Sequence, residues 1–151
     1  GVESTIVGCF ETPMLLRPGG LSRSAIERVL GCPLQRPPAP SGAEAGQPTA
    51  PGMLASHYAP RTPVRLNAVR LEPGEALLAF GPDPAPGSDN AAAMLNLSAR
   101  GSLTEAAANL FSHLRALDTA GARAIAVMPV PQNDLGEAIN ARLRRAAVRP
   151  E

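Results

Sequence analysis

Proline sets the strongest limit on how this chain can fold. Two regions that are rich in apolar residues are separated by a stretch that contains Pro33, Pro37, Pro38, Pro40 and Pro48. Each proline fixes φ and removes a backbone donor, so neither a helix nor an inner strand can continue through this stretch. The Ser, Gly and Gln residues between them add little packing surface. We therefore expect an extended linker over residues 33–61, which separates an N-terminal part, residues 1–32, from a C-terminal part, residues 62–151.

The C-terminal part alternates between strand-like and helix-like patterns. Apolar runs at residues 64–66, 76–80, 94–97 and 124–130 predict strands. A capping box of Ser102 and Glu105 opens a helix that Gly121 should end, and a last helix should begin at Asn133 or Asp134. Alternation of this kind favours an α/β fold. We expect a Rossmann-like sheet of about four to five mostly parallel strands flanked by helices, with at least one βαβ unit.

The N-terminal part reads as two short strands and a helix. Residues 5–7 and 14–16 are the strands, and a Pro-Gly-Gly turn follows the second. The helix should begin after Ser22 or Ser24 and stop at Gly31, which suits a left-handed C-terminal position. So small a piece cannot bury a core alone. Because Gly1 leads almost directly into a strand, we expect that a preceding segment has been lost.

Composition argues against several classes of function. Hydrophobic residues make up 44% of the chain and the formal net charge is +1, which gives no electrostatic reason to expect DNA or membrane binding. No apolar run reaches the roughly 18 residues of a membrane span. The aromatic residues are Phe10, Tyr58, Phe80 and Phe111. So few aromatic rings do not predict a stacking platform for single-stranded nucleic acid.

The chain also lacks the residues that several catalytic templates need. All 14 basic residues are arginine, so a mechanism that needs a lysine cannot be complete here. Cys9 and Cys32 are too few for a disulfide framework or a zinc site, and we expect two reduced thiols. Neither a GxxxxGK[ST] phosphate loop nor a convincing Ser-His-Asp spacing occurs. We therefore assign no catalytic residue and no metal ligand within the chain.

Three segments stand in an informative order. Gly-Val-Glu-Ser-Thr-Ile-Val at residues 1–7 is followed by Leu-Leu-Arg-Pro-Gly-Gly at 15–20 and by Pro-Gly-Met-Leu-Ala-Ser-His-Tyr-Ala-Pro at 51–60. In these segments the chain resembles the long threonylcarbamoyl-AMP synthases, in which such a linker joins a YrdC-like domain to a Rossmann-like C-terminal domain. Residues 134–139 and the following Arg142-Leu143 also look like the last helix of that C-terminal domain. The resemblance implies that residues 1–32 are the C-terminal tail of the YrdC-like catalytic domain.

The resemblance implies a nucleotidyltransferase. The family makes threonylcarbamoyl-AMP and pyrophosphate from L-threonine, bicarbonate and ATP, and a downstream transferase passes the threonylcarbamoyl group to tRNA. ATP is then a substrate, with magnesium supplied by the complete enzyme, and the protein is expected in the cytoplasm. Because most of the catalytic domain would precede residue 1, the fragment alone is expected to be inactive.

The resemblance also assigns roles to three residues, each with a simpler alternative. It places Ser4 on L-threonine, although a serine at a strand edge can also cap a turn. It places Arg17 on the ATP phosphates, although an exposed arginine before a turn often does little. It places Tyr58 on the nucleotide, although its ring could also anchor the linker.

A different class of function stays open from the sequence. Four arginines gather near the end of the last helix, at Arg142, Arg144, Arg145 and Arg149. They could make the chain a stand-alone interaction module or RNA-binding α/β module, with affinity that falls as salt rises. Cations at a helix C-terminus also complement the helix dipole, which is the simpler interpretation.

Overall fold

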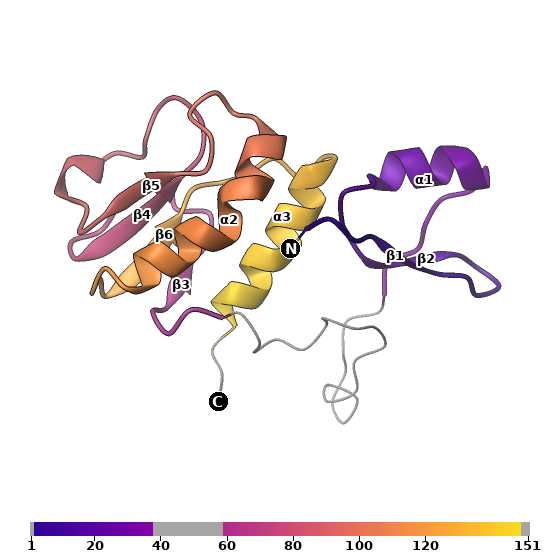
Figure 1. Cartoon of the computed structure of the whole chain (residues 1–151), viewed down its shortest axis with the longest axis horizontal. Coiled ribbons are helices and arrows are strands. Elements are labelled where there is room, and N and C mark those ends of the chain that lie inside the picture. Colours follow the sequence, from indigo (N-terminus) through magenta and orange to yellow (C-terminus); the bar gives the residue numbers. More distant parts are fainter. Residues whose placement is uncertain (1, 38–58, 149–151) are drawn as a thin grey trace.

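A computed structural model describes residues 2–37 and 59–148 of the chain. Helix α3 (Leu135–Ala147) lies between a parallel sheet on one side and an N-terminal hairpin on the other (Figure 1). The predictions made for residues 38–58 of the linker, including the role of Tyr58, lie outside the described residues.

The C-terminal part contains a four-stranded parallel sheet. Its strands are β3 (Val64–Arg65), β4 (Glu75–Ala79), β5 (Met94–Asn96) and β6 (Ala124–Val127). They lie in the order β3-β6-β4-β5, and each neighbouring pair is parallel. The α/β class and the parallel sheet predicted from the sequence are thus confirmed.

The order of the strands departs from the simplest form of the predicted βαβ unit. Helix α2 (Leu103–Asp118) does connect β5 to β6. The two strands are not neighbours, however, because β4 lies between them. All five residues of β4 are buried, as expected for a strand with a partner on each side and both faces covered.

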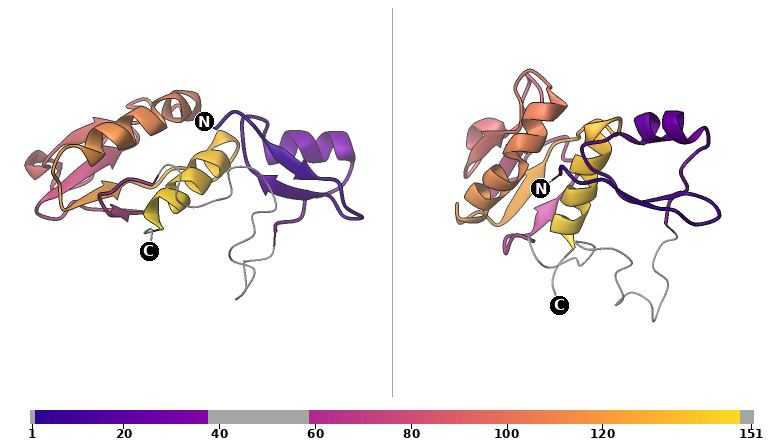
Figure 2. Two further views of the ribbon diagram at one scale, coloured as in Figure 1. Left: turned by 60° about the horizontal axis from the view of Figure 1, so that its bottom comes forward. Right: turned by 45° about the vertical axis from the view of Figure 1, so that its right-hand side comes forward.

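The two faces of the sheet are covered differently. Helices α2 and α3 both pack on one face, where Leu78, Ile125 and Val127 point into the main core. The other face carries Leu77 and Ala126, and it is covered by the loops that precede and follow β4; the short helix η2 (Ser88–Asn90) lies in the second of these loops. Figure 2 shows the helices and the sheet from two further directions.

Helix α2 begins at the predicted capping residue, but only half of the expected box forms. Ser102 Oγ accepts a hydrogen bond from the Glu105 backbone N–H at 3.3 Å. The Glu105 carboxylate does not bond back to Ser102; it accepts from the Ser98 hydroxyl at 2.6 Å. The Ser102 backbone N–H donates instead to Ser98 Oγ at 2.9 Å. The helix ends at Asp118, slightly before Gly121, which has the left-handed φ of 70°.

Helix α3 is fixed at its start by a buried amide. The Asn140 side chain donates to the carbonyls of Val130, Pro131 and Gly136, at 3.0, 3.1 and 2.8 Å. The residue before the helix, Asp134, has a φ of 50°, which is uncommon for a residue with a side chain. Asn140 thus holds the loop that carries this unusual backbone.

The N-terminal part forms a hairpin and one helix. Strands β1 (Ile6–Gly8) and β2 (Met14–Arg17) are antiparallel, and α1 (Arg23–Leu30) follows them. Ser22 is the N-cap, and Gly31 ends the helix with a φ of 71°, as predicted. A small apolar cluster joins these elements and consists of Val7, Leu15, Ile26 and Leu34.

The N-terminal part is attached to the C-terminal core. Val2 is 6% exposed and belongs to the same apolar cluster as Ile139 and Leu143 of α3. Arg23 also forms an ion pair with Glu137 of α3 at 3.0 Å. Within the described residues, none of the helices combines the length and the apolar character needed to cross a lipid bilayer.

Candidate functional site

The hairpin brings two of the predicted site residues together. Ser4 lies just before β1, and Arg17 is the last residue of β2, opposite Ile6. The Arg17 Nε–H donates to the Ser4 backbone carbonyl at 3.2 Å. Ser4 is exposed and Arg17 is half-buried. The Arg17 guanidinium thus lies against the Ser4 backbone at one end of the hairpin, although the two residues are 13 positions apart in the sequence.

Glycine makes this approach possible. A Cβ at Gly19 would overlap the backbone of Ser4 and Thr5, so only glycine fits at this position without a shift of the chain. The Gly20 N–H donates to the Glu3 carbonyl at 2.9 Å. The turn after β2 therefore lies directly against the segment that carries Ser4.

The Thr5 hydroxyl also links the segment before β1 to the turn after β2. Thr5 Oγ1 donates to the Leu21 carbonyl at 3.0 Å and accepts from the Leu21 N–H at 3.1 Å. Ser4 is thus followed by a residue that is bonded across the turn. The relative positions of Ser4 and Arg17 are determined by backbone contacts and do not depend on flexible side chains alone.

Helix α3 supports the turn from the other side. Arg142 is 8% exposed, and its Nη1–H donates to the Pro18 carbonyl at 2.9 Å. Pro18 directly follows Arg17, the residue that the resemblance places on the ATP phosphates. The C-terminal helix therefore holds the neighbour of Arg17. Sequence reasoning missed this contact, because nothing in the local pattern indicates which carbonyl a distant arginine will reach.

The arginines near the end of α3 do not share one exposed surface. Arg142 is buried, Arg145 is half-buried, and Arg144 is exposed. Arg149 lies outside the described residues. The arginines that favoured an RNA-binding module in the sequence therefore do not form one exposed patch. Arg142 is buried and donates to the Pro18 carbonyl, and of the three described arginines only Arg144 is exposed.

A second polar network lies at the carboxyl end of β5, where ligands often bind in parallel α/β sheets. The Glu105 carboxylate accepts from Ser98 Oγ and from Arg100 Nε, at 2.6 and 3.0 Å. The Ser98 hydrogen bond and the positive charge of Arg100 lower the pKa of Glu105, against a smaller opposing effect of burial. These side chains bond to one another and to the start of α2, so a structural role accounts for them.

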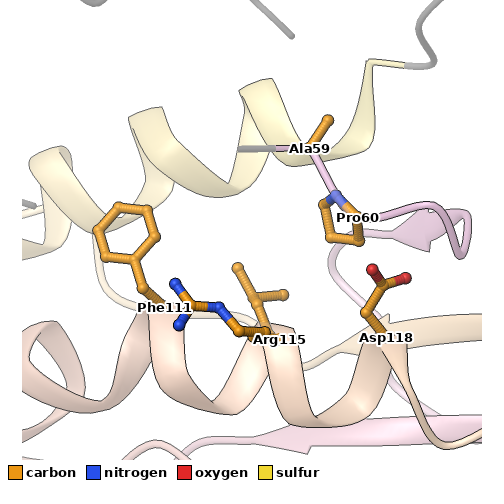
Figure 3. A pocket seen from close by; sticks show the side chains of 6 residues that line it. Ala59, Pro60, Phe111, Arg115 and Asp118 are labelled. Carbon is orange, nitrogen blue, oxygen red and sulfur yellow. The ribbon is translucent and has the colours of Figure 1, made fainter. Parts of the chain in front are cut away.

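A small cavity lies where the chain enters the C-terminal part (Figure 3). It has a volume of about 190 Å³ and is lined by Ala59, Pro60, Phe111, Leu114, Arg115 and Asp118. Pockets that hold small-molecule ligands usually exceed about 300 Å³. Asp118 Oδ1 accepts from the Thr62 N–H at 2.8 Å. Burial acts to raise the pKa of Asp118, but backbone hydrogen bonds from Thr62 and Arg61 outweigh it, so the pKa is lowered. The cavity contains neither Ser4 nor Arg17.

The described parts of the chain offer no cluster that would hold a metal ion. In residues 2–37 and 59–148, no three His, Cys, Asp or Glu side chains come together in a way that could coordinate one. Cys9 and Cys32 are both free thiols.

Comparison with known proteins identifies the family. The model of the family described as "Threonylcarbamoyl-AMP synthase, C-terminal domain" matches residues 21–148. The chain belongs to this family. The resemblance deduced from the three sequence segments is thus confirmed.

Two curated relatives within the threonylcarbamoyl-AMP synthases are similar over almost the whole chain. One, from Pyrococcus abyssi, is 35% identical, and the match covers 97% of this chain and 46% of the relative. The other, from Bacillus subtilis, is 31% identical, with 97% and 45% covered. The chain therefore spans about half the length of the threonylcarbamoyl-AMP synthases that it matches.

Solved structures of the same family have the same fold. The crystal structure of P. abyssi Sua5 complexed with L-threonine matches with a TM-score of 0.76 and 30% identity, over 97% of this chain and 46% of that one. A variant of P. abyssi Sua5, in which a histidine and the adjacent tyrosine are replaced by alanine, matches with a TM-score of 0.69 and 29% identity, over 97% and 45%.

Proposed function

We propose that the chain is the C-terminal part of an L-threonylcarbamoyladenylate synthase. The complete enzyme would convert L-threonine, bicarbonate and ATP into threonylcarbamoyl-AMP and pyrophosphate. The observation that supports the proposal is the hydrogen bond from Arg17 Nε to the Ser4 backbone carbonyl at 3.2 Å, because it joins the two residues to which we assign phosphate and L-threonine. The names of the relatives and the L-threonine bound to the P. abyssi protein support the same reaction.

The proposed roles follow from the chemistry of the side chains. The Ser4 hydroxyl would donate a hydrogen bond to the carboxylate of L-threonine. The Arg17 guanidinium would bind ATP phosphate oxygens, because its planar fork matches two oxygens at once. Tyr58 would contact the nucleotide from the linker. This chain contains an adjacent histidine–tyrosine pair at residues 57–58, the same pair of residue types that is replaced in the P. abyssi variant.

The proposal divides the chain into three parts. Residues 1–32 would belong to the YrdC-like catalytic domain, 33–61 would be the linker, and 62–151 would be the Rossmann-like C-terminal domain. Magnesium would bind with the nucleotide in the complete enzyme. The product would serve a cytoplasmic transferase that modifies tRNA.

Pyrophosphate release tests the function. The complete reading frame around this sequence should be expressed beside chain 1–151, and both proteins supplied with ATP, L-threonine and bicarbonate. We expect the longer protein to release pyrophosphate in a threonine-dependent way and chain 1–151 to release none above background. Turnover by chain 1–151 at the rate of the longer protein would refute the proposal that most of the catalytic domain lies outside this chain. Pyrophosphate release that does not depend on threonine in the longer protein would refute the proposed function.

Variants of the longer protein test the residue roles. Ser4→Ala should raise the KM for L-threonine more than the KM for ATP, and Arg17→Gln should do the reverse. Tyr58→Phe should weaken ATP binding by about 0.5–1.5 kcal/mol, the usual net value of one hydrogen bond. Thr104, an exposed hydroxyl of α2 far in sequence from the hairpin, gives a matched control as Thr104→Ala. Equal effects on both substrates in every variant would remove these residues from the site.

A further inference from the structure

The C-terminal part holds the hairpin at residues that flank both proposed substrate ligands. Val2, two positions before Ser4, is 6% exposed and lies in the main apolar core, to which α3 contributes. Pro18 directly follows Arg17, and its carbonyl accepts a hydrogen bond from Arg142 Nη1 at 2.9 Å. Figure 1 shows α3 between the sheet and the hairpin. The chain is thus fixed to the C-terminal part just before one ligand and just after the other.

The contact of Arg142 with the turn is made in a buried place. Arg142 is 8% exposed, so water reaches its guanidinium poorly. Hydrogen bonds with a charged donor are stronger than those between neutral groups, and buried polar groups are costly to separate from their partners. A shift of Pro18 away from α3 would break this bond. The bond therefore favours one position of the turn that carries Arg17.

A second polar contact joins α3 to the start of α1. The Glu137 carboxylate accepts from Arg23 Nη2 at 3.0 Å and, at each of its oxygens, from Arg23 Nε at 3.3 Å. Arg23 Nη1 also donates to the Leu34 carbonyl at 2.7 Å. One arginine thus connects α3 with the start of α1 and with the segment that follows α1. The docking of the N-terminal part on α3 therefore does not depend on Arg142 alone.

Hydrogen bonds within the hairpin relate the turn to both ligands. The Gly20 N–H donates to the Glu3 carbonyl at 2.9 Å, and the Arg17 Nε–H donates to the Ser4 carbonyl at 3.2 Å. The turn and the segment before β1 are therefore held together as one piece. A displacement of Pro18 would displace Arg17 first, because the two residues are adjacent in the chain.

We propose that α3 positions the substrate site on the hairpin, with Arg142 as the positioning residue for Arg17. Arg142 acts through the Pro18 carbonyl and makes no contact with the substrate. The inference rests on the role proposed above for Arg17 on the ATP phosphates. It gives the C-terminal domain a part in the affinity for ATP, beyond a contribution to stability.

Steady-state kinetics of the longer protein test the inference, with pyrophosphate release as the readout. Arg142→Met keeps an apolar stem and removes the donor, while the pair of Arg23 with Glu137 keeps the two parts docked. A displaced Arg17 would bind phosphate less well in the ground state and in the transition state alike. The KM for ATP should therefore rise at least fivefold, with kcat within twofold of the unchanged protein. A purely structural role would instead lower the apparent kcat through loss of folded enzyme and leave the KM unchanged.

A double variant shows whether Arg142 acts through Arg17. In the Arg17→Gln background, Arg142→Met should change the KM for ATP less than twofold, because the side chain that it positions is gone. Arg144→Gln is the control for charge, since Arg144 is an exposed arginine of the same helix. Arg65→Gln is the control for stability, since Arg65 pairs with Glu75 inside the C-terminal part. It should lower the melting temperature without a change in the KM for ATP.

Two results would overturn the inference and leave the proposed function intact. One is a rise of less than fivefold in the KM for ATP of Arg142→Met, and the other is a rise of the same size in the Arg17→Gln background as in the unchanged protein. If Arg17→Gln itself leaves the KM for ATP unchanged, the role of Arg17 and this inference fail together, while threonine-dependent turnover still supports the function. A longer protein without threonine-dependent pyrophosphate release refutes the function and this inference with it.

Discussion

Replacement of Arg65 by glutamine should destabilise the C-terminal part far more than an ordinary loss of an ion pair. Arg65 Nε and Nη2 donate to the two carboxylate oxygens of Glu75 at 2.9 and 2.6 Å. Glu75 is 2% exposed, whereas the Arg65 side chain is 39% exposed. The arginine can thus be hydrated after its partner is removed, but the carboxylate cannot.

The asymmetry of burial sets the expected magnitudes. Arg65→Gln leaves a buried carboxylate without its cation, which typically costs about 3–5 kcal/mol. Glu75→Gln leaves a half-exposed arginine and keeps an oxygen that can accept the Glu72 N–H, so its cost should be about 0.5–1.5 kcal/mol. Arg123→Gln is the matched control, because its pair with Glu72 is exposed and should contribute about 0–1 kcal/mol.

The destabilisation caused by Arg65→Gln should also depend on pH. The Arg65 hydrogen bonds lower the pKa of Glu75, against the opposing effect of burial. A carboxyl group with a lowered folded-state pKa stabilises the protein above its unfolded-state pKa, and this stability is lost as the pH falls through the folded-state value. In Arg65→Gln the Glu75 carboxyl loses the two hydrogen bonds from arginine, so it can be protonated in mild acid, which relieves its burial penalty. The difference between the unchanged chain and the variant should therefore begin to shrink above a pH of about 4.3, where the buried carboxyl of the variant is protonated. It should shrink further below that pH, where the unchanged chain loses the stabilisation from its Glu75 carboxylate.

Urea unfolding of chain 1–151 at pH 7 and at lower pH measures these free energies. A cost for Arg65→Gln no greater than that of Arg123→Gln would refute the reasoning, because the carboxylate would then be hydrated in the folded state. A larger cost for Glu75→Gln than for Arg65→Gln would refute it as well.

Three further predictions concern other parts of the fold. Asn140→Ala should cost about 1–3 kcal/mol in urea unfolding, because carbonyls of the 130–136 loop lose a buried donor. Gly19→Ala should lower the melting temperature of chain 1–151, since its Cβ would overlap the backbone of Ser4 and Thr5. Deletion of residues 1–50 should leave a single cooperative thermal transition at a lower temperature, because the sheet, α2 and α3 retain a core of their own; loss of cooperativity would show that the hairpin belongs to the same folding unit.

Local patterns were sufficient to predict the elements of the fold. The apolar runs that became β4 and β6, and the helical spacing behind Ser102, are signals within a few neighbouring residues. A capping serine and a left-handed glycine likewise act within one turn, so the bounds of α1 were predictable from Ser22 and Gly31. Interactions of this range are encoded by adjacent residues.

Long-range partners were not predictable in the same way. The Glu105 carboxylate bonds to Ser98 and not to the capping residue Ser102, because the loop after β5 brings a second hydroxyl within reach. Arg142 is buried against Pro18, although its position near a helix end is equally typical of an exposed cation. In both cases the hydrogen-bond partner depends on how another segment of the chain is placed, which the local sequence does not specify. The link of α3 to the site therefore required the structure.

The position of β6 has a consequence for synthesis of the chain. This strand lies between β3 and β4 but follows both in the sequence. While a ribosome has delivered only the first three strands of the sheet, β3 lacks its neighbour, and β4 has one open apolar edge of the kind that promotes aggregation. Helix α3 emerges later still and brings Glu137, which pairs with Arg23 of α1, and Arg142, which donates to the Pro18 carbonyl after β2. The hairpin and α1 must therefore wait for α3 before they can dock on it, and a nascent chain that stops short of α3 presents chaperones with both an open edge and an undocked hairpin.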